Sequence, residues 1–215
     1  MQKGLQKAAR AIAGLMCAVG FSASWAASDL DADLLKNGYF GVNGGRADYT
    51  YRNPPAAPVD DLCDPVAYEC NSWAGGWKLY GGYMIRPYFG IEAVAFRFGD
   101  VGQKYDLGGG LFLNQSIHIH GYGLVAVGEL PLGRVELQGR AGYAAVTAVR
   151  TDEFVGVVNL RSEKTRAEPL LGVGIGVRVW QGLRVRVDGD YTWARTEAGE
   201  KFEATFLSLG VAYRF

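Results

Sequence analysis

The stretch LRVRVDGDYTW, from Leu183 to Trp193, alternates between apolar and polar residues along its whole length. Successive side chains of a β-strand point to opposite faces, so one face of this segment is apolar and the other is charged. The odd-numbered positions hold leucine, valine, glycine and aromatic residues, while the even-numbered positions hold arginine, aspartate and threonine. A tilted strand needs about 9–11 residues to cross a bilayer, and this segment has that length. The stretch therefore predicts a strand that separates two different environments.

The same alternation recurs from residue 38 to the end of the chain. The connections after the second, fourth and sixth predicted strands are tight, whereas those after the first, third and fifth are long and polar. Bacterial outer-membrane barrels have short periplasmic turns and longer external loops. We therefore predict an all-β fold, an eight-stranded antiparallel up-and-down transmembrane β-barrel over residues 38–215. The predicted strand ranges are Tyr39–Tyr51, Trp73–Ile85, Phe89–Gly99, Gln115–Glu129, Arg134–Val149, Pro169–Val179, Leu183–Arg195 and Phe202–Phe215.

A soluble β-sandwich also alternates, but it turns its polar face to water and its apolar face to the core. Here the apolar face carries Tyr191, Trp193, Tyr213 and Phe215 near strand ends, as the aromatic girdle of a membrane barrel does. The polar face is rich in glycine and carries charges of both signs, which suits a narrow lumen filled by side chains. Backbone groups in lipid must all be paired, so the sheet is expected to close on itself. These features favour the membrane barrel.

The N-terminal residues have the pattern of an export signal. Cations before residue 11 precede an apolar stretch at 11–21, and Ser24-Trp25-Ala26 then offers small residues at the positions that signal peptidase reads. We expect a cleaved signal peptide at 1–26, a short periplasmic segment at 27–37 and a location in the outer membrane of a Gram-negative bacterium. An uncleaved anchor is the alternative, but the apolar stretch is short for a bilayer span.

The composition supports an exported folded protein without a nucleic-acid partner. Hydrophobic residues make up 49% of the chain, which argues against disorder, and the formal net charge is zero, which gives no basis for nucleic-acid binding. Cys63 and Cys70 lie close together in a polar segment that contains proline. Two cysteines in an oxidising compartment are expected to form a disulfide bond, and two free thiols in a loop are the alternative.

Few residues suggest catalysis or metal binding. His118 and His120 share a face of one predicted strand, but no third ligand for a metal ion is evident. Ser116 lies on the same face, as a serine nucleophile would, but no acid can be assigned to it. The glycine-rich stretch LGGGLF at 107–112 lacks the lysine of a phosphate-binding loop. We therefore expect no catalytic residues, no cofactor and no metal.

Three pieces of the chain resemble the OmpA-like transmembrane domain family of outer-membrane proteins. They are GYFGVNGGRADY at Gly38–Tyr49, GGYMIRPYFGIE at Gly81–Glu92 and LSLGVAYRF at Leu207–Phe215. The resemblance implies the same barrel, outer-membrane lipid and lipopolysaccharide as surroundings, and periplasmic chaperones as partners. The ending is similar to the signal read by the barrel-assembly machinery, which assigns that role to Leu209, Val211, Tyr213 and Phe215.

Barrels of this family keep ion pairs in the lumen. The strand alternation places six charged residues on the inward face: Lys78, Glu92, Glu136, Arg140, Arg186 and Asp188. The expected function is a structural or surface-interaction role, through envelope integrity, adhesion or contact with a host surface or phage. The alternatives are a narrow porin-like channel and a lipid A-modifying enzyme.

Overall fold

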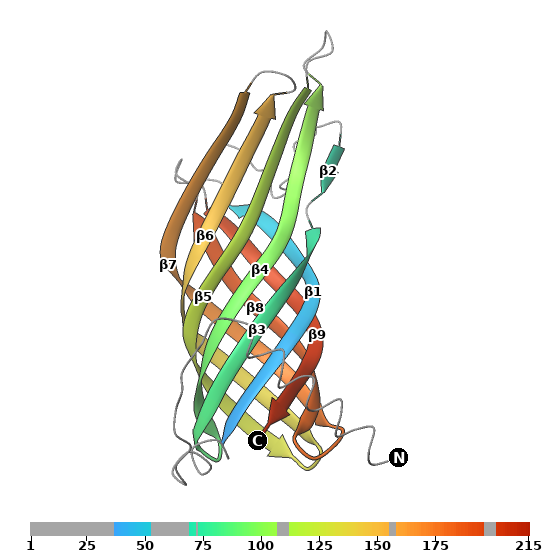
Figure 1. Cartoon of the computed structure of the whole chain (residues 1–215), viewed down its shortest axis with the longest axis vertical. Helices are drawn as coiled ribbons and strands as arrows, with labels where there is room; N and C mark the ends of the chain where they lie inside the picture. The colour runs from blue at the N-terminus through green and yellow to red at the C-terminus, as the bar shows by residue number, and fades with distance from the viewer. Residues whose placement is uncertain (1–36, 53–68, 72, 107–111, 155–157, 196–200) are drawn as a thin grey trace, which may run out of the picture. The chain divides into compact units, whose positions relative to one another are not determined.

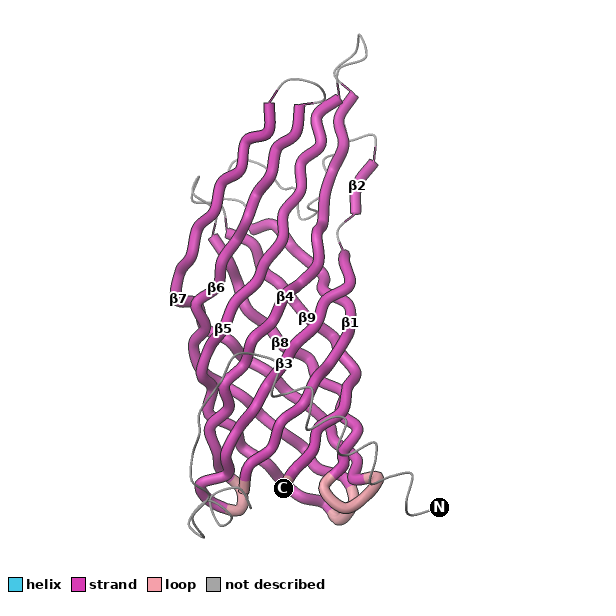
Figure 2. The backbone as a smooth tube through the Cα atoms, viewed as in Figure 1, coloured by secondary structure: helices cyan, strands magenta, loops and turns pink. Residues whose placement is uncertain are grey.

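The computed structural model describes residues 37–52, 69–71, 73–106, 112–154, 158–195 and 201–215. The predicted signal peptide, the predicted periplasmic segment apart from Asn37, and Cys63 lie outside these residues. Every regular element of the described part is a strand (Figure 2). No helix among the described residues is long and apolar enough to cross a membrane.

Eight long strands close into one antiparallel barrel. Each long strand pairs with its neighbour in the chain, and β1 also pairs with β9, which closes the sheet (Figure 1). The predicted eight-stranded up-and-down barrel is therefore confirmed. A short ninth strand, β2, lies in the predicted first loop and pairs with β4. The strands are β1 (Gly38–Arg52), β2 (Glu69–Asn71), β3 (Trp73–Arg86), β4 (Phe89–Asp106), β5 (Phe112–Leu132), β6 (Val135–Phe154), β7 (Val158–Arg178), β8 (Leu183–Arg195) and β9 (Lys201–Arg214).

The alternation of the sequence becomes an inside and an outside of the barrel. In β8, Val187 is 48% exposed on the outside, whereas the next residue, Asp188, is completely buried inside. The same contrast holds around the sheet and produces an outward band of exposed apolar side chains, which we call the apolar belt. The belt includes Val42, Leu79, Ile91, Leu124, Leu137, Val173, Val187 and Leu209. A soluble sandwich would bury these residues and expose the charged ones.

Strands β4 to β7 are longer than predicted. They have 18 to 21 residues each, whereas β1, β3, β8 and β9 have 13 to 15. Their outer parts, residues 99–106, 112–120, 146–154 and 158–168, form a sheet that continues past the apolar belt (Figure 1). We call this sheet the extension. The predictions that β4 ends at Gly99 and β7 begins at Pro169 were therefore wrong.

Strands β4 to β7 are longer than predicted because apolar alternation marks only the part of a strand that has an apolar outer face. Beyond the belt the outer face of the sheet is largely polar, and the inner face mixes apolar residues such as Val101 and Ile119 with polar ones, so the pattern of an apolar outer face ends while the hydrogen-bonded ladder continues. The pairing of β6 with β7 runs without interruption to Phe154 and Val158. Much of the second and third predicted long loops is consequently sheet.

The opposite end of the barrel has tight turns. Gly133 in the β5–β6 turn and Gly182 in the β7–β8 turn have φ angles of 71° and 77°, a conformation that glycine adopts without strain. The two ends of the barrel sequence meet here, because the backbone N–H of Phe215 donates a hydrogen bond to the carbonyl of Gly38 at 3.1 Å. We refer to this end as the turn end.

Candidate functional site

The centre of the lumen holds an ion network around Asp188. Its carboxylate lies 3.1 Å from Lys78 Nζ, 3.2 Å from Arg140 Nη2 and 3.3 Å from Arg186 Nη2. Glu92 joins the network through Arg140 Nη1, which lies 3.7 Å from Glu92 Oε1. All five side chains are buried. The structure thus brings together five of the six residues that alternation placed in the lumen.

Three further residues complete this network and were missed in the sequence. Asp190 pairs with Lys78 and, at 3.1 Å, with Arg140 Nη2. Asn43 Nδ2 donates to Asp188 Oδ2 at 2.7 Å, and the Tyr39 hydroxyl donates to Glu92 Oε2 at 3.0 Å. Asp190 lies on the same even-numbered face of β8 as Asp188, so alternation alone was a sufficient signal for it. Asn43 and Tyr39 gave no such signal, because neither is charged.

Glu136 belongs to a second cluster, nearer the turn end. Its Oε2 lies 3.2 Å from Arg184 Nε. Glu129 lies 3.1 Å from Arg214 Nη2 and accepts a hydrogen bond from Gln138 Nε2 at 2.7 Å. The lumenal charges are therefore divided between two levels of the barrel.

The lumen toward the extension is filled by aromatic rings. Phe98 of β4 stacks on Phe96 and on Phe206 of β9, each with a centroid distance of 4.8 Å. Phe98 and Phe206 are essentially completely buried, as is Ile119 beside them. Strands β4 and β9 are not neighbours in the sheet, so the Phe98–Phe206 contact spans the lumen. This apolar layer was not predicted from the sequence.

His118 and His120 lie on the outer face of β5, just beyond Tyr122 of the apolar belt. Their rings stack with centroids 5.7 Å apart, and His118 Nδ1 lies 3.0 Å from Asp100 Oδ1. Burial lowers the pKa of His118, with Arg97 and His120 acting in the same direction and Asp100 opposing them. Within the described ranges, no group of three or more His, Cys, Asp or Glu side chains is placed to hold a metal ion.

Asp100 is the acid that the sequence could not assign to Ser116 and His118. It reaches His118 because a β-bulge between Phe98 and Val101 shifts the register of β4. The hydrogen bonds of the described residues do not include one between Ser116 and His118, and a serine nucleophile needs such a contact with its base. The structure therefore forms the acid–histidine pair without the serine contact.

The residues of the predicted assembly signal lie on the outside of β9, except Phe215, which directly follows that strand. Leu209, Val211, Tyr213 and Phe215 are each between 41% and 59% exposed. The rings of Tyr213 and Phe215 lie about 6 Å from that of Phe40 on β1, with centroid distances of 6.1 and 5.9 Å. This last strand is the one that closes the barrel against β1.

The barrel has a charged interior, an apolar outer belt and a closing terminal strand, and residues 13–215 match the family model described as the outer membrane protein beta-barrel domain. The chain belongs to this outer-membrane β-barrel family. Membership in this family supports a location in the outer membrane, where the hydrocarbon of the bilayer surrounds the apolar belt. Comparison with curated protein sequences gives no match.

Solved structures of other outer-membrane barrels have a similar fold. Ail, the attachment invasion locus protein of Yersinia pestis, solved with the heparin analogue sucrose octasulfate, has a TM-score of 0.52 at 14% identity, over 83% of this chain and 99% of Ail. Neisserial surface protein A has a TM-score of 0.54 at 12% identity, over 83% of this chain and 97% of its own. OprG of Pseudomonas aeruginosa has a TM-score of 0.52 at 15% identity, over 84% of this chain and 97% of OprG. At these identities the likeness concerns the fold alone.

Proposed function

We propose that this outer-membrane barrel is a surface-interaction protein that presents the extension outside the cell. Outer-membrane barrels turn their short connections to the periplasm, which assigns the turn end to the periplasm and the extension to the exterior. The extension continues about ten residues beyond the belt, which at a strand tilt near 40° corresponds to roughly 25 Å. The OmpA-like resemblance of the sequence supports the same kind of role.

The observation that carries the proposal against a channel is the contact of Phe98 with Phe206 across the lumen. Nearer the turn end lie the buried ion pairs of Asp188 with Lys78 and Arg140. A small barrel of eight strands has an interior just wide enough to be filled by side chains. We therefore expect no steady solute pathway.

Conductance in planar bilayers tests the closed lumen. The wild-type protein should give small and rare openings, and a Phe98→Ala/Phe206→Ala variant should give more frequent and larger ones. Steady, large wild-type conductance would overturn the proposal in favour of a porin-like channel. Tyr122→Ala, which truncates an aromatic ring on the outer surface, is the control and should conduct like the wild type.

Adhesion of bacteria tests the role of the extension. One variant joins Gly102 to Ser116 and Arg150 to Ser162 by two-residue turns, which shortens both hairpins at paired positions. Cells with this variant should keep a heat-modifiable barrel in the outer membrane but lose adhesion to epithelial cells or to a coated matrix. Equal adhesion by both strains, or wild-type adhesion no greater than that of cells without the protein, would contradict the proposal.

A lipid A-modifying enzyme is the second candidate, favoured by the Asp100–His118 pair beside Ser116 at the rim of the belt. Mass spectrometry of lipid A from cells with and without the protein tests it. We expect identical lipid A in both. A change that disappears with Ser116→Ala would establish the enzyme.

A further inference from the structure

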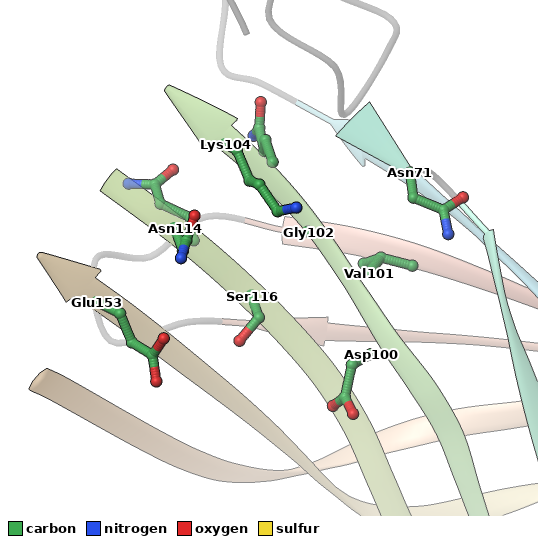
Figure 3. A pocket seen from close by; sticks show the side chains of 10 residues that line it. Asn71, Asp100, Val101, Gly102, Lys104, Asn114, Ser116 and Glu153 are labelled. Carbon is green, nitrogen blue, oxygen red and sulfur yellow. The ribbon is translucent and has the colours of Figure 1, made fainter. Parts of the chain in front are cut away.

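The outer face of the extension contains a pocket of about 560 Å³ that is lined mainly by residues with polar side chains. Four strands contribute to it, namely β2, β4, β5 and β6 (Figure 3). Most of its lining lies farther from the apolar belt than His118, and it contains neither the lumenal ion network nor the aromatic layer. The pocket is therefore separate from the lumenal features, and it shares Asp100 and Ser116 with the group beside His118.

The strand register explains how the pocket forms. Asn71 of β2, Gly102 of β4 and Ser116 of β5 lie opposite one another in one cross-strand row and provide a floor of small side chains. A Cβ atom at Gly102 would lie 2.7 Å from the carbonyl oxygen of Gln115, so glycine is required there. The next row on the same face, two residues farther along the strands, holds larger polar residues, because Asn114 lies opposite both Lys104 and Glu153.

The side of the pocket that is nearer the apolar belt depends on the β-bulge of β4. The register shift between Phe98 and Val101 turns Asp100 to the outer face, where its side chain lines the pocket and also pairs with His118. The walls are thus held by paired strands and by the Asp100–His118 contact, and a ligand would find them already ordered. Preformed walls lower the entropic cost of binding.

We propose that this pocket binds an uncharged saccharide. Asn71 and Asn114 supply amide groups, each of which can donate and accept hydrogen bonds, and Ser116 supplies a hydroxyl. Asp100 and Glu153 supply carboxylates, which accept hydrogen bonds from hydroxyl groups. A sugar ring presents several adjacent hydroxyls that both donate and accept, and this mixture of groups is complementary to them.

The charges and the apolar content of the lining argue against other ligands. Two carboxylates and one ammonium group leave the lining slightly acidic, which disfavours sulfated or phosphorylated glycans. Val101 is the one large apolar residue among those that line the pocket, and its side chain is buried in the core, so the pocket offers no anchor for an apolar peptide side chain. The inference deepens the proposed function, because it needs the extension to be external. The saccharide could come from the core of neighbouring lipopolysaccharide or from a foreign glycan.

Saturation-transfer NMR on the full barrel in phosphatidylcholine nanodiscs tests the inference. The probes are maltotetraose and lacto-N-neotetraose as foreign neutral glycans, a dephosphorylated heptose–hexose fragment of the core without its acidic sugar as the lipopolysaccharide source, and a heparin tetrasaccharide as the anionic competitor. We expect at least one of the three neutral probes to bind more tightly than the heparin probe, and the one that binds identifies the source. Failure of all three, or tighter heparin binding, would overturn the proposal.

Substitutions inside and outside the pocket test whether the probe binds there. Glu153→Ala and Asn114→Ala each remove hydrogen-bonding groups and should weaken binding by about fivefold, the effect of one lost hydrogen bond. Glu163→Ala is the matched control, since Glu163 is also an exposed acid on the extension but lies outside the pocket, and it should bind like the wild type. Equal binding by all three variants would refute the site.

Two further measurements distinguish loss of binding from loss of folding and locate the bound probe. Heat-dependent gel mobility shows whether each variant is folded, and chemical-shift changes of the Gly102 and Ser116 amides in the wild type locate the probe without any substitution. Absence of such changes upon binding would also refute the site. The nanodisc assay uses no cells, so a protein that adheres through its loops would pass the adhesion test and fail this one.

Discussion

Asp188 illustrates what a charge needs inside a barrel. Its carboxylate is completely buried, yet three cationic groups lie within 3.3 Å and Asn43 donates to it as well. A buried ion pair adds little net stability compared with apolar packing, but removal of one partner leaves a charge without compensation. The lumenal network therefore constrains which single substitutions the barrel tolerates.

Lys78→Met is predicted to destabilise the barrel by about 3–5 kcal/mol, because Lys78 pairs with both Asp188 and Asp190. Urea unfolding in lipid vesicles measures the change. Arg161→Met removes an exposed pair with Glu163 and should cost at most about 1 kcal/mol. A Lys78→Met/Asp190→Asn double variant should lose less than the sum of the two single losses; strict additivity would show that the two residues do not interact.

On the scale of the strands, the two faces of β8 differ in solvent rather than in secondary structure. Val187 lies in the apolar belt, and its neighbours Arg186 and Asp188 lie in the lumen. The cost of a charge on the outer face should therefore depend on depth in the bilayer. Depth can be varied along the outer faces of β8 and its neighbour β7.

Val187→Arg should cost about 2–4 kcal/mol, the penalty for a cation near the middle of the bilayer. Ala167→Arg, on the exposed outer face of β7 beyond the belt, should cost about 0–1 kcal/mol. Unfolding free energies in lipid vesicles compare the two. Equal losses would mean that the belt does not mark the hydrocarbon.

Gly133 and Gly182 both have left-handed φ angles, and alanine substitutions at the two positions compare the cost of backbone strain alone with that of strain plus steric clash. A Cβ atom at Gly133 would meet nothing within 4 Å, whereas one at Gly182 would lie 2.5 Å from the carbonyl oxygen of Arg214. Gly133→Ala should then cost about 1–2 kcal/mol for the left-handed conformation alone. Gly182→Ala should cost more in the same unfolding assay, and the reverse order would contradict this account.

For the whole molecule, the last strand decides whether a closed barrel exists. Strand β9 pairs along its length with both β1 and β8, and Phe215 adds the final hydrogen bond to Gly38. An open sheet would leave backbone groups of β1 and β9 unpaired in lipid, where each costs several kcal/mol. Closure and insertion are therefore expected to depend on the same residues.

Deletion of Phe215 should lower the amount of heat-modifiable barrel in outer-membrane fractions, because it removes both the terminal aromatic residue and the hydrogen bond to Gly38. Gel mobility with and without heating measures this amount. Phe215→Tyr keeps an aromatic residue and the backbone N–H and should assemble like the wild type. Unchanged levels after the deletion would argue against a terminal assembly signal.

The sequence by itself determined the closed barrel, the two faces of its strands and the inward position of six charged residues. It could do so because lipid imposes a local rule: each residue faces either hydrocarbon or the interior, and alternation records which. The rule does not apply outside the bilayer, so the parts of β4 beyond Gly99 and of β7 before Pro169 were not predicted.

Only the tertiary structure decided which residues meet. The pairing of Arg140 with Asp188, the stack of Phe98 on Phe206, and the approach of Asp100 to His118 join strands that are far apart in the chain or displaced by a bulge. Contacts of this kind depend on the tilt and register of the whole sheet. The outer pocket is of the same kind, since its floor and walls exist only where the rows of four strands coincide.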